Sequence, residues 1–143
     1  MRPIEILLVE DNPGDARLTR EAFSQGTVRT NMHHARDGEQ AIAFLRRLGG
    51  YQDAPTPDLV ILDLNLPRRS GREVLEDIKN DPELRQIPVI VLTSSQAQED
   101  VFHSYRLHAN CFITKPGDLE TLIHVAHSIE EFWFKLVRLP SST

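Results

Sequence analysis

Short aliphatic runs alternate with longer amphipathic segments along the chain, and no other feature constrains its fold as strongly. The aliphatic runs predict strands at residues 4–9, 30–35, 59–62, 89–92 and 111–114. The amphipathic segments predict helices at residues 15–24, 39–48, 71–80, 98–107 and 119 to about 139. Such alternation is typical of a parallel sheet with crossover helices, so the sequence predicts an α/β fold. Three of the strands are continuously apolar, which indicates that helices cover both faces of the five-stranded sheet.

The length and composition are those of one globular domain. The chain has 143 residues, of which 40% are hydrophobic and 26% charged. This length is enough to form one hydrophobic core but too short for two well-formed cores. The loop at residues 49–57 is the only stretch that resembles a linker, and it is too short to separate domains. We therefore expect a single domain over residues 1–143, with no output domain.

Charge and cysteine content argue against several classes of protein. The formal net charge is −5, and no basic cluster exceeds the pairs Arg46-Arg47 and Arg68-Arg69, so nucleic acid binding is not expected. The single cysteine, Cys111, allows no intramolecular disulfide, and the sequence contains no leader-like segment or apolar run of transmembrane length. We expect a cytoplasmic protein that does not bind a membrane.

Polar residues gather where the predicted strands end. Glu10 and Asp11 follow the first strand, Asp63 follows the third, Thr93 the fourth and Lys115 the fifth. Each has an ordinary alternative role, such as capping the next helix or forming a turn. Because ligands of open α/β sheets bind at the carboxyl ends of the strands, the coincidence favours a functional site. The sequence predicts one pocket that holds three carboxylates, a hydroxyl and an ammonium group.

The charges of this pocket indicate what it binds. Carboxylates about 5 Å apart repel one another by about 3 kcal/mol per pair at an effective dielectric constant near 20, so a cation is expected between them. An all-oxygen site suits Mg²⁺, and the six histidines are scattered over different predicted elements, which disfavours zinc. A metal ion, a hydroxyl and a lysine beside Asp63 suit the formation of an acyl phosphate, with Asp63 as the nucleophile.

These motifs together resemble the CheY-like receiver domain of two-component response regulators, over nearly the whole chain. They are Glu10-Asp11, the segment Asp63-Leu-Asn-Leu-Pro67 with Gly71 beyond it, Thr93-Ser94 and Lys115-Pro116. The resemblance implies a flavodoxin-like, doubly wound sheet with the strand order 2-1-3-4-5. It also implies a phosphorelay function in which a sensor histidine kinase is the partner and Mg²⁺ the cofactor.

The resemblance implies a role for each acidic residue. Asp63 would be the phosphoacceptor and a metal ligand, Asp11 a direct ligand of Mg²⁺, and Glu10 a ligand that acts through the water shell of the ion. The backbone carbonyl of Asn65 would complete the metal site.

The resemblance also implies roles for residues on the last two strands. Thr93 would hydrogen-bond the phosphoryl group and Lys115 would pair with it. Phe112 stands where the family carries an aromatic switch residue that acts with Thr93. Phenylalanine keeps the ring of a rotamer switch but lacks the hydroxyl of tyrosine. The alternative is that Phe112 is an ordinary core residue.

A narrower resemblance concerns the partner. The opening Val-Glu-Asp-Asn-Pro-Gly-Asp at residues 9–15 and the pair Phe132-Trp133 are similar to stand-alone regulators that partner bacterial and cyanobacterial phytochromes. This similarity implies a phytochrome kinase as the phosphoryl donor. With no output domain expected, the phosphorylated state would be read by another protein, by a change of oligomer or by relay to a second histidine.

Two other function classes share parts of this pattern. A magnesium-dependent phosphohydrolase of the haloacid-dehalogenase type also forms an aspartyl phosphate, but it carries a second aspartate two residues after the nucleophile, where this chain has Asn65. A degenerate receiver that serves only as a scaffold would lack parts of the acidic pocket, which is intact here. We therefore expect no enzyme, beyond catalysis of its own phosphorylation and dephosphorylation.

The C-terminal helix predicts an interface. Its apolar residues cover a much wider arc than the stripe of about 100° that faces one core. The alternative is that the protein's own tail covers the helix. We expect a homodimer through the last two helices and the fifth strand. The candidate interface residues are Val101, Phe102, Tyr105, Phe132, Trp133 and Phe134.

Overall fold

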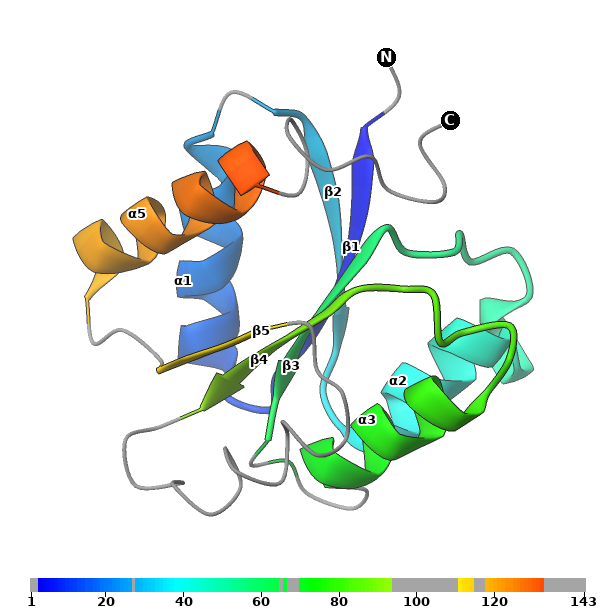
Figure 1. The fold of residues 1–143 in the computed structure, drawn as a ribbon. Helices are drawn as coiled ribbons and strands as arrows, with labels where there is room; N and C mark the ends of the chain where they lie inside the picture. Colours follow the sequence, from blue (N-terminus) through cyan, green and yellow to red (C-terminus); the bar gives the residue numbers. More distant parts are fainter. Residues whose placement is uncertain are drawn as a thin grey trace.

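A five-stranded parallel sheet forms the centre of the molecule (Figure 1). The structure is a computed structural model that describes residues 3–26, 28–64, 66, 70–93, 111–114 and 118–132, without the side chains of Thr93, Cys111, Phe112 and Thr114. Within these residues the strand order is β2-β1-β3-β4-β5. The strands are β1 (Ile4–Val9), β2 (Thr30–Ala35), β3 (Leu59–Asp63), β4 (Val89–Thr93) and β5 (Cys111–Thr114). The predicted α/β class with a parallel sheet is confirmed.

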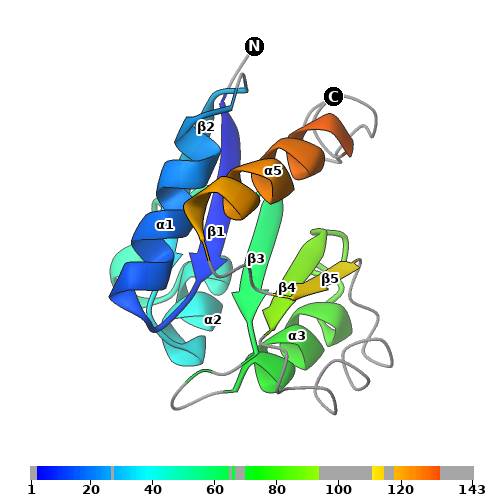
Figure 2. The same cartoon turned by 90° about the vertical axis from the view of Figure 1, so that its left-hand side faces the viewer.

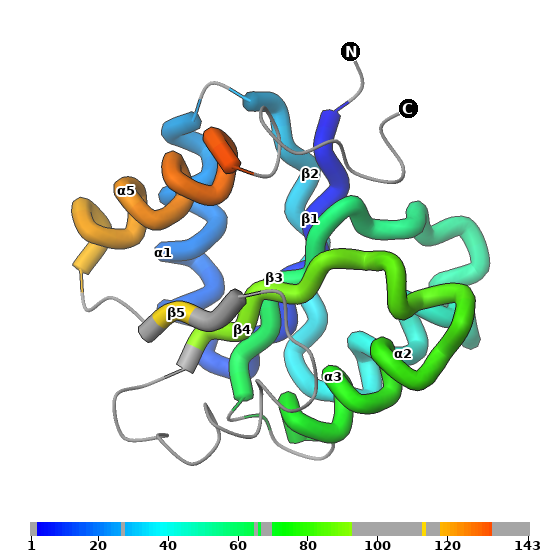
Figure 3. Tube along the Cα trace, in the orientation of Figure 1, coloured from blue at the N-terminus to red at the C-terminus, as the bar shows by residue number. Residues whose placement is uncertain are grey.

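Helices lie on both faces of the sheet. They are α1 (Pro13–Ser24), α2 (Gly38–Arg46), α3 (Gly71–Asn80) and α5 (Leu119–Ile129), with a short 3-10 helix, η1 (Gly49–Tyr51). The tube in Figure 3 shows α1 and α5 together on one side and α2 and α3 on the other. The helix predicted at 98–107 lies outside the described residues. Among the described residues, none of the helices combines the length and the apolar composition that a membrane span requires.

Local backbone chemistry moves two predicted helix boundaries. Helix α1 starts at Pro13 rather than at residue 15, because Asn12 caps it and proline fits the first helical turn. Helix α2 ends at Arg46 rather than at residue 48, because Arg47 adopts a left-handed conformation with φ of 57°. Strands β3 and β4 each extend one residue further than predicted, to Asp63 and Thr93. This extension places the two polar residues on the sheet itself.

The sheet separates two apolar cores. Alternate residues of β1 point to opposite faces: Leu7 and Val9 contribute to the core under α2 and α3, and Ile6 and Leu8 to the core under α1 and α5. All four of these side chains are buried, as are the residues of β3. Burial on both faces therefore explains the continuous apolar runs of the sequence.

The regular part of the C-terminal helix ends early within the described residues, and its predicted continuation beyond residue 132 lies outside them. Helix α5 ends at Ile129, and residues 130–132 continue as a π-helical turn, whereas a helix to about residue 139 was predicted. Residues 133–143 lie outside the described part of the chain. Glu130 is fully buried, and its carboxylate lies where a Cβ on Gly26 would be. The apolar pattern of this helix, which predicts an interface, gives no sign of a buried carboxylate.

Helix α5 begins with a charged cap whose effect should depend on pH. The side chain of Asp118 accepts hydrogen bonds from the backbone N–H (2.8 Å) and the hydroxyl (3.1 Å) of Thr121. The backbone hydrogen bond, followed by the one from the hydroxyl, holds the pKa of Asp118 below its ordinary value. The cap therefore stabilises the fold fully above the ordinary aspartate pKa and loses its effect as the pH falls through the lowered value.

We expect Asp118→Ala to lower the melting temperature at pH 7. This decrease in melting temperature should become smaller below about pH 4, where the carboxylate is protonated. Thermal unfolding followed by circular dichroism over this pH range would measure the difference. Asp53→Ala, which removes an exposed loop carboxylate, is the control. An equal loss for Asp118→Ala at every pH would contradict the charged-cap account.

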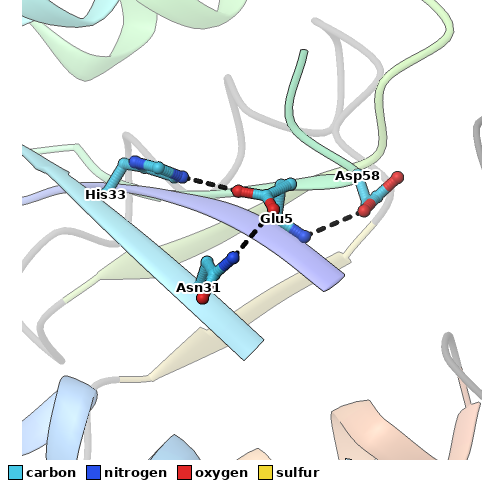
Figure 4. Close-up of polar contacts among 4 residues, drawn as sticks. All are labelled: Glu5, Asn31, His33 and Asp58. Carbon is cyan, nitrogen blue, oxygen red and sulfur yellow. Dashed lines mark hydrogen bonds and ion pairs between the residues drawn. The ribbon is translucent and has the colours of Figure 1, made fainter. Parts of the chain in front are cut away.

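A polar cluster occupies the far end of β1 from Glu10 (Figure 4). The carboxylate of Glu5 is 2.7 Å from Nε2 of His33 and accepts a hydrogen bond of 3.0 Å from the side chain of Asn31. The backbone N–H of Glu5 donates to Asp58, whose side chain is buried. These contacts join β2, β1 and the start of β3. Glu5 and Asp58 therefore have structural roles, at the opposite end of the strands from Glu10 and Asp63.

Candidate functional site

Three carboxylates meet at the carboxyl ends of β1 and β3. The two strands are paired so that Val9 lies beside Leu62, which brings the next residues, Glu10 and Asp63, to the same edge of the sheet. One carboxylate oxygen each from Glu10, Asp11 and Asp63 lies within 4.8 Å of the others. Glu10 and Asp63 are buried, with exposed fractions of 1% and 5%, whereas Asp11 is exposed.

Backbone and side-chain hydrogen bonds hold the acidic pair in place. The backbone N–H of Glu10 donates to the carbonyl of Ala35 (3.0 Å), and its carboxylate accepts from the N–H of Asn12 (3.2 Å). Asn12 in turn caps α1 by accepting from the N–H of Asp15 (3.0 Å). The start of α1 thus fixes the loop that carries Asp11.

His34 supports the backbone of the acidic site, although no sequence motif marks it. Its Nε2 donates a hydrogen bond of 2.7 Å to the backbone carbonyl of Glu10. This residue lies on β2 beside Leu8, one strand away from the acidic pair. In the sequence it was one of several scattered histidines. Only the register between β2 and β1 reveals that it contacts the backbone of the site.

The donor set fits a hard divalent cation. Three carboxylates this close repel one another by about 3 kcal/mol per pair at an effective dielectric constant near 20. All three donors are oxygens, and the described residues offer no other group of three histidine, cysteine or acidic ligands. Such a site suits Mg²⁺ or a similar ion that keeps part of its water shell. Glu10, Asp11 and Asp63 could therefore hold a divalent ion beside the exposed edge of the site.

The remaining predicted site residues are placed only in part. Thr93 is the last residue of β4 and pairs with Thr114 of β5, so its backbone lies one strand beyond Asp63, but its side chain is outside the described residues. The backbone of Phe112 lies on β5, and its side chain is likewise outside them. Asn65 and Lys115 also lie outside, so their roles stay predictions.

The predicted interface residues are mostly outside the described part of the chain. Phe132 is described and is 51% exposed. The others, Val101, Phe102, Tyr105, Trp133 and Phe134, lie outside the described residues.

Gly71 brings helix α3 directly against the backbone of the phosphoacceptor candidate. Its N–H donates to the carbonyl of Leu64 (3.1 Å), and Ser70 caps the helix in a reciprocal capping box with Glu73. A Cβ at Gly71 would overlap the carbonyl oxygen of Asp63 and the Cα of Leu64. Because these are backbone atoms, they cannot rotate away. Glycine is therefore required for this close approach.

We expect Gly71→Ala to destabilise the fold by about 1–3 kcal/mol and to slow phosphoryl acceptance, because the end of β3 must shift. Gly50→Ala is a matched control, since a Cβ there meets nothing within 4 Å. Urea unfolding would measure the stability of both variants, and labelling with a small phosphoryl donor would measure acceptance. If both variants behave like the wild type, Gly71 does not set the position of Asp63.

The chain has a parallel sheet of order β2-β1-β3-β4-β5, with an acidic pair after the first strand and an aspartate at the end of the third. This combination defines the receiver class of signalling domain. The sequence bears this out: residues 6–127 match the response regulator receiver domain. The chain belongs to this family.

The chain is also similar to individual response regulators. It is 46% identical to response regulator Rcp1 of Synechocystis sp. over 140 residues, which cover 98% of this chain and 95% of that protein. The crystal structure of the phosphorylated cyanobacterial phytochrome response regulator RcpA superposes with a TM-score of 0.92 and 50% identity, over 98% of this chain and 100% of RcpA. The Mn²⁺-bound form of Rcp1 gives a TM-score of 0.89 at 47% identity, over 97% and 100% of the two chains.

Proposed function

We propose that this response regulator accepts a phosphoryl group on Asp63 from a phosphohistidine of a sensor kinase. The observation that carries the proposal is the meeting of Glu10, Asp11 and Asp63 within 4.8 Å, in a chain of the receiver family. Asp63 is the one carboxylate of the three that ends a central strand, and the approach of Gly71 restrains its backbone. We assign it the role of nucleophile and assign metal binding to Glu10 and Asp11, together with Asp63 and the backbone carbonyl of Asn65.

The transfer itself is a displacement at phosphorus. A carboxylate oxygen of Asp63 forms a bond to phosphorus while the bond from phosphorus to the donor nitrogen breaks, and that nitrogen keeps the electron pair. A bound Mg²⁺ would offset the negative charge of the carboxylates and of the phosphoryl oxygens. In this proposal Thr93 and Lys115 bind the phosphoryl oxygens, and Thr93 with Phe112 relays the change to the surface. The chain catalyses only its own phosphorylation and dephosphorylation.

The similarity to RcpA and Rcp1 supports a particular kind of donor. RcpA is a cyanobacterial phytochrome response regulator, and it shares 50% of its sequence with this chain over nearly all of both proteins. We therefore propose a phytochrome-type histidine kinase in the cytoplasm as the partner. Rcp1, a similar protein, has been solved in a Mn²⁺-bound form, which supports the proposal that this chain also binds a divalent ion.

The direct test is transfer from a panel of purified, radiolabelled histidine kinases that includes a phytochrome kinase. The proposal predicts a base-labile, hydroxylamine-sensitive acyl phosphate on this chain, formed fastest with the phytochrome kinase and only with a divalent ion present. Steady hydrolysis of small phosphate esters would indicate a phosphohydrolase instead. Failure to take phosphate from every kinase and from acetyl phosphate would indicate a scaffold.

We further propose that the chain forms a homodimer through α5, β5 and the segment 98–107. The half-exposed ring of Phe132, in the turn that follows α5, supports an apolar contact there. We expect the wild type to sediment as a dimer at tens of micromolar and a Phe132→Glu/Trp133→Glu variant to sediment as a monomer. Leu48→Glu, at another exposed apolar residue, is the control. A wild type that stays monomeric with and without a phosphoryl mimic would exclude the dimer.

A further inference from the structure

Two open grooves lie along the edge of the molecule formed by α1 and β2, and they share Arg20. One has a volume of about 460 Å³ and is lined by Arg17, Arg20, His34 and Arg36, with Asp11 at its end. The other has a volume of about 680 Å³ and is lined by Arg20 and Arg29 and by the residues of β2 up to His33. Figure 2 shows β2 at the outer edge of the sheet with α1 alongside it. The shared arginine makes the two grooves one continuous surface.

This surface is basic although the chain as a whole is acidic. The four arginines that line it are exposed, and their guanidinium groups make no hydrogen bond or ion pair with any residue in the described part of the chain. The formal net charge of the protein is −5, and Asp11 is the one carboxylate among the described residues that line the two grooves. Positive charge is therefore concentrated on this edge, where it would attract an acidic ligand.

The backbone of β2 is open along the same edge. Strand β2 pairs only with β1 in the described sheet. The N–H of Ile4 donates to the carbonyl of Arg29, and the N–H of Glu10 donates to the carbonyl of Ala35. The backbone N–H and C=O groups of the odd-numbered residues of β2 therefore point toward β1. The backbone N–H and C=O groups of the even-numbered residues point the other way. These residues are Thr30, Met32 and His34.

The larger groove lies between the end of α1 and this open edge. Its lining includes Phe23 and Ser24 of α1 and every residue from Arg29 to His33, although successive side chains of a strand point to opposite faces. At about 3.3 Å per residue, the six residues of β2 offer an edge of about 20 Å. The length of this edge and its outward-pointing backbone groups match an extended peptide better than a small anion.

We propose that β2 binds an acidic, extended segment of a partner protein as an additional strand. Backbone hydrogen bonds to Thr30, Met32 and His34 would hold the segment, and its acidic side chains would face Arg17 and Arg20 on α1. Charged residues beside an edge strand can also serve only to prevent aggregation, and that alternative predicts no binding. The proposed contact does not include Asp63, although the smaller groove ends at Asp11, and it does not depend on phosphoryl transfer.

The test uses a fluorescent peptide of about eight residues in which glutamate alternates with threonine, with lysine in place of glutamate as the control peptide. We expect the acidic peptide to bind the full chain and the lysine peptide not to bind. Arg20→Glu should weaken binding at least about tenfold, whereas Arg85→Glu, at an exposed arginine outside the grooves, should not. Labelling of Asp63 by acetyl phosphate should be unchanged in both variants.

Two further measurements separate strand addition from simple charge attraction. Hydrogen exchange should slow at the amides of Thr30, Met32 and His34 when the peptide binds. Thr30→Pro removes an outward N–H at the first residue of the edge strand, a position that tolerates proline, and should also weaken binding. The proposal is overturned if the acidic peptide does not bind, if Arg20→Glu binds it equally well, or if these amides gain no protection. Equal competition by a single-stranded oligonucleotide or inorganic phosphate would assign the surface to phosphate groups instead.

Discussion

Replacing Asp63 with asparagine is expected to abolish phosphoryl acceptance while leaving the fold intact. The side chain is 5% exposed at the end of a central strand, and asparagine has nearly the same shape but no nucleophilic carboxylate. Without a divalent ion the variant should be at least as stable as the wild type, because it removes repulsion of about 3 kcal/mol or less with each neighbouring carboxylate. Labelling with acetyl phosphate and thermal unfolding with and without Mg²⁺ would measure both effects.

Asp53→Asn, at an exposed loop position, is the matched control and should be labelled like the wild type. Stoichiometric, hydroxylamine-sensitive label on the Asp63→Asn protein would show that another residue is the acceptor. Loss of the folded state in this variant would show that Asp63 has a structural role that the site geometry does not suggest.

The second large effect concerns the metal. We expect Asp11→Asn to weaken binding of Mg²⁺ or Mn²⁺ at least about tenfold, because it removes one of three negative charges within reach of the ion. Since Asp11 is exposed, the folded state should be little affected. Calorimetric titration of each ion into the apoprotein would measure the affinity, and Glu76→Gln, at an exposed position on α3, is the control. Equal affinities for the wild type and Asp11→Asn would remove Asp11 from the metal site.

The sheet and the acidic cluster could be predicted because both follow from short-range patterns. Continuous apolar runs, such as residues 59–62, identify strands that are buried on both faces. Once the strands are parallel, residues that follow them must gather at one edge, and Glu10, Asp11 and Asp63 do so. The strand order and the individual roles came from the resemblance to receivers rather than from these patterns.

Contacts that depend on strand register could not be predicted. The hydrogen bond from His34 to the carbonyl of Glu10 exists because β2 lies beside β1 in one register, which no local pattern specifies. The same holds for the contact of Glu5 with His33, which places a carboxylate in a strand. The burial of Glu130 against Gly26 depends on how the end of α5 meets the loop after α1, and an apolar helical pattern gives no sign of it.

The basic edge formed by α1 and β2 could not be predicted from the sequence either. The basic edge contains Arg17, Arg20, Arg29 and Arg36, which are separated by two or more residues along the chain and so form no run of positive charge in the sequence. Helix α1 and strand β2 bring the four together. Charge that is dispersed in the sequence can therefore form a single surface, and net charge alone does not exclude one.

Mapping the phosphorylated residue by mass spectrometry tests the central claim most directly. The wild-type protein would be incubated with acetyl phosphate and Mg²⁺, and the acyl phosphate would be trapped by borohydride reduction before digestion. The account predicts a single modified residue, Asp63, whose modification disappears when a chelator replaces Mg²⁺. Modification at any other residue, or full modification of Asp63 in the presence of the chelator, would contradict the assignment of Asp63 and its metal site.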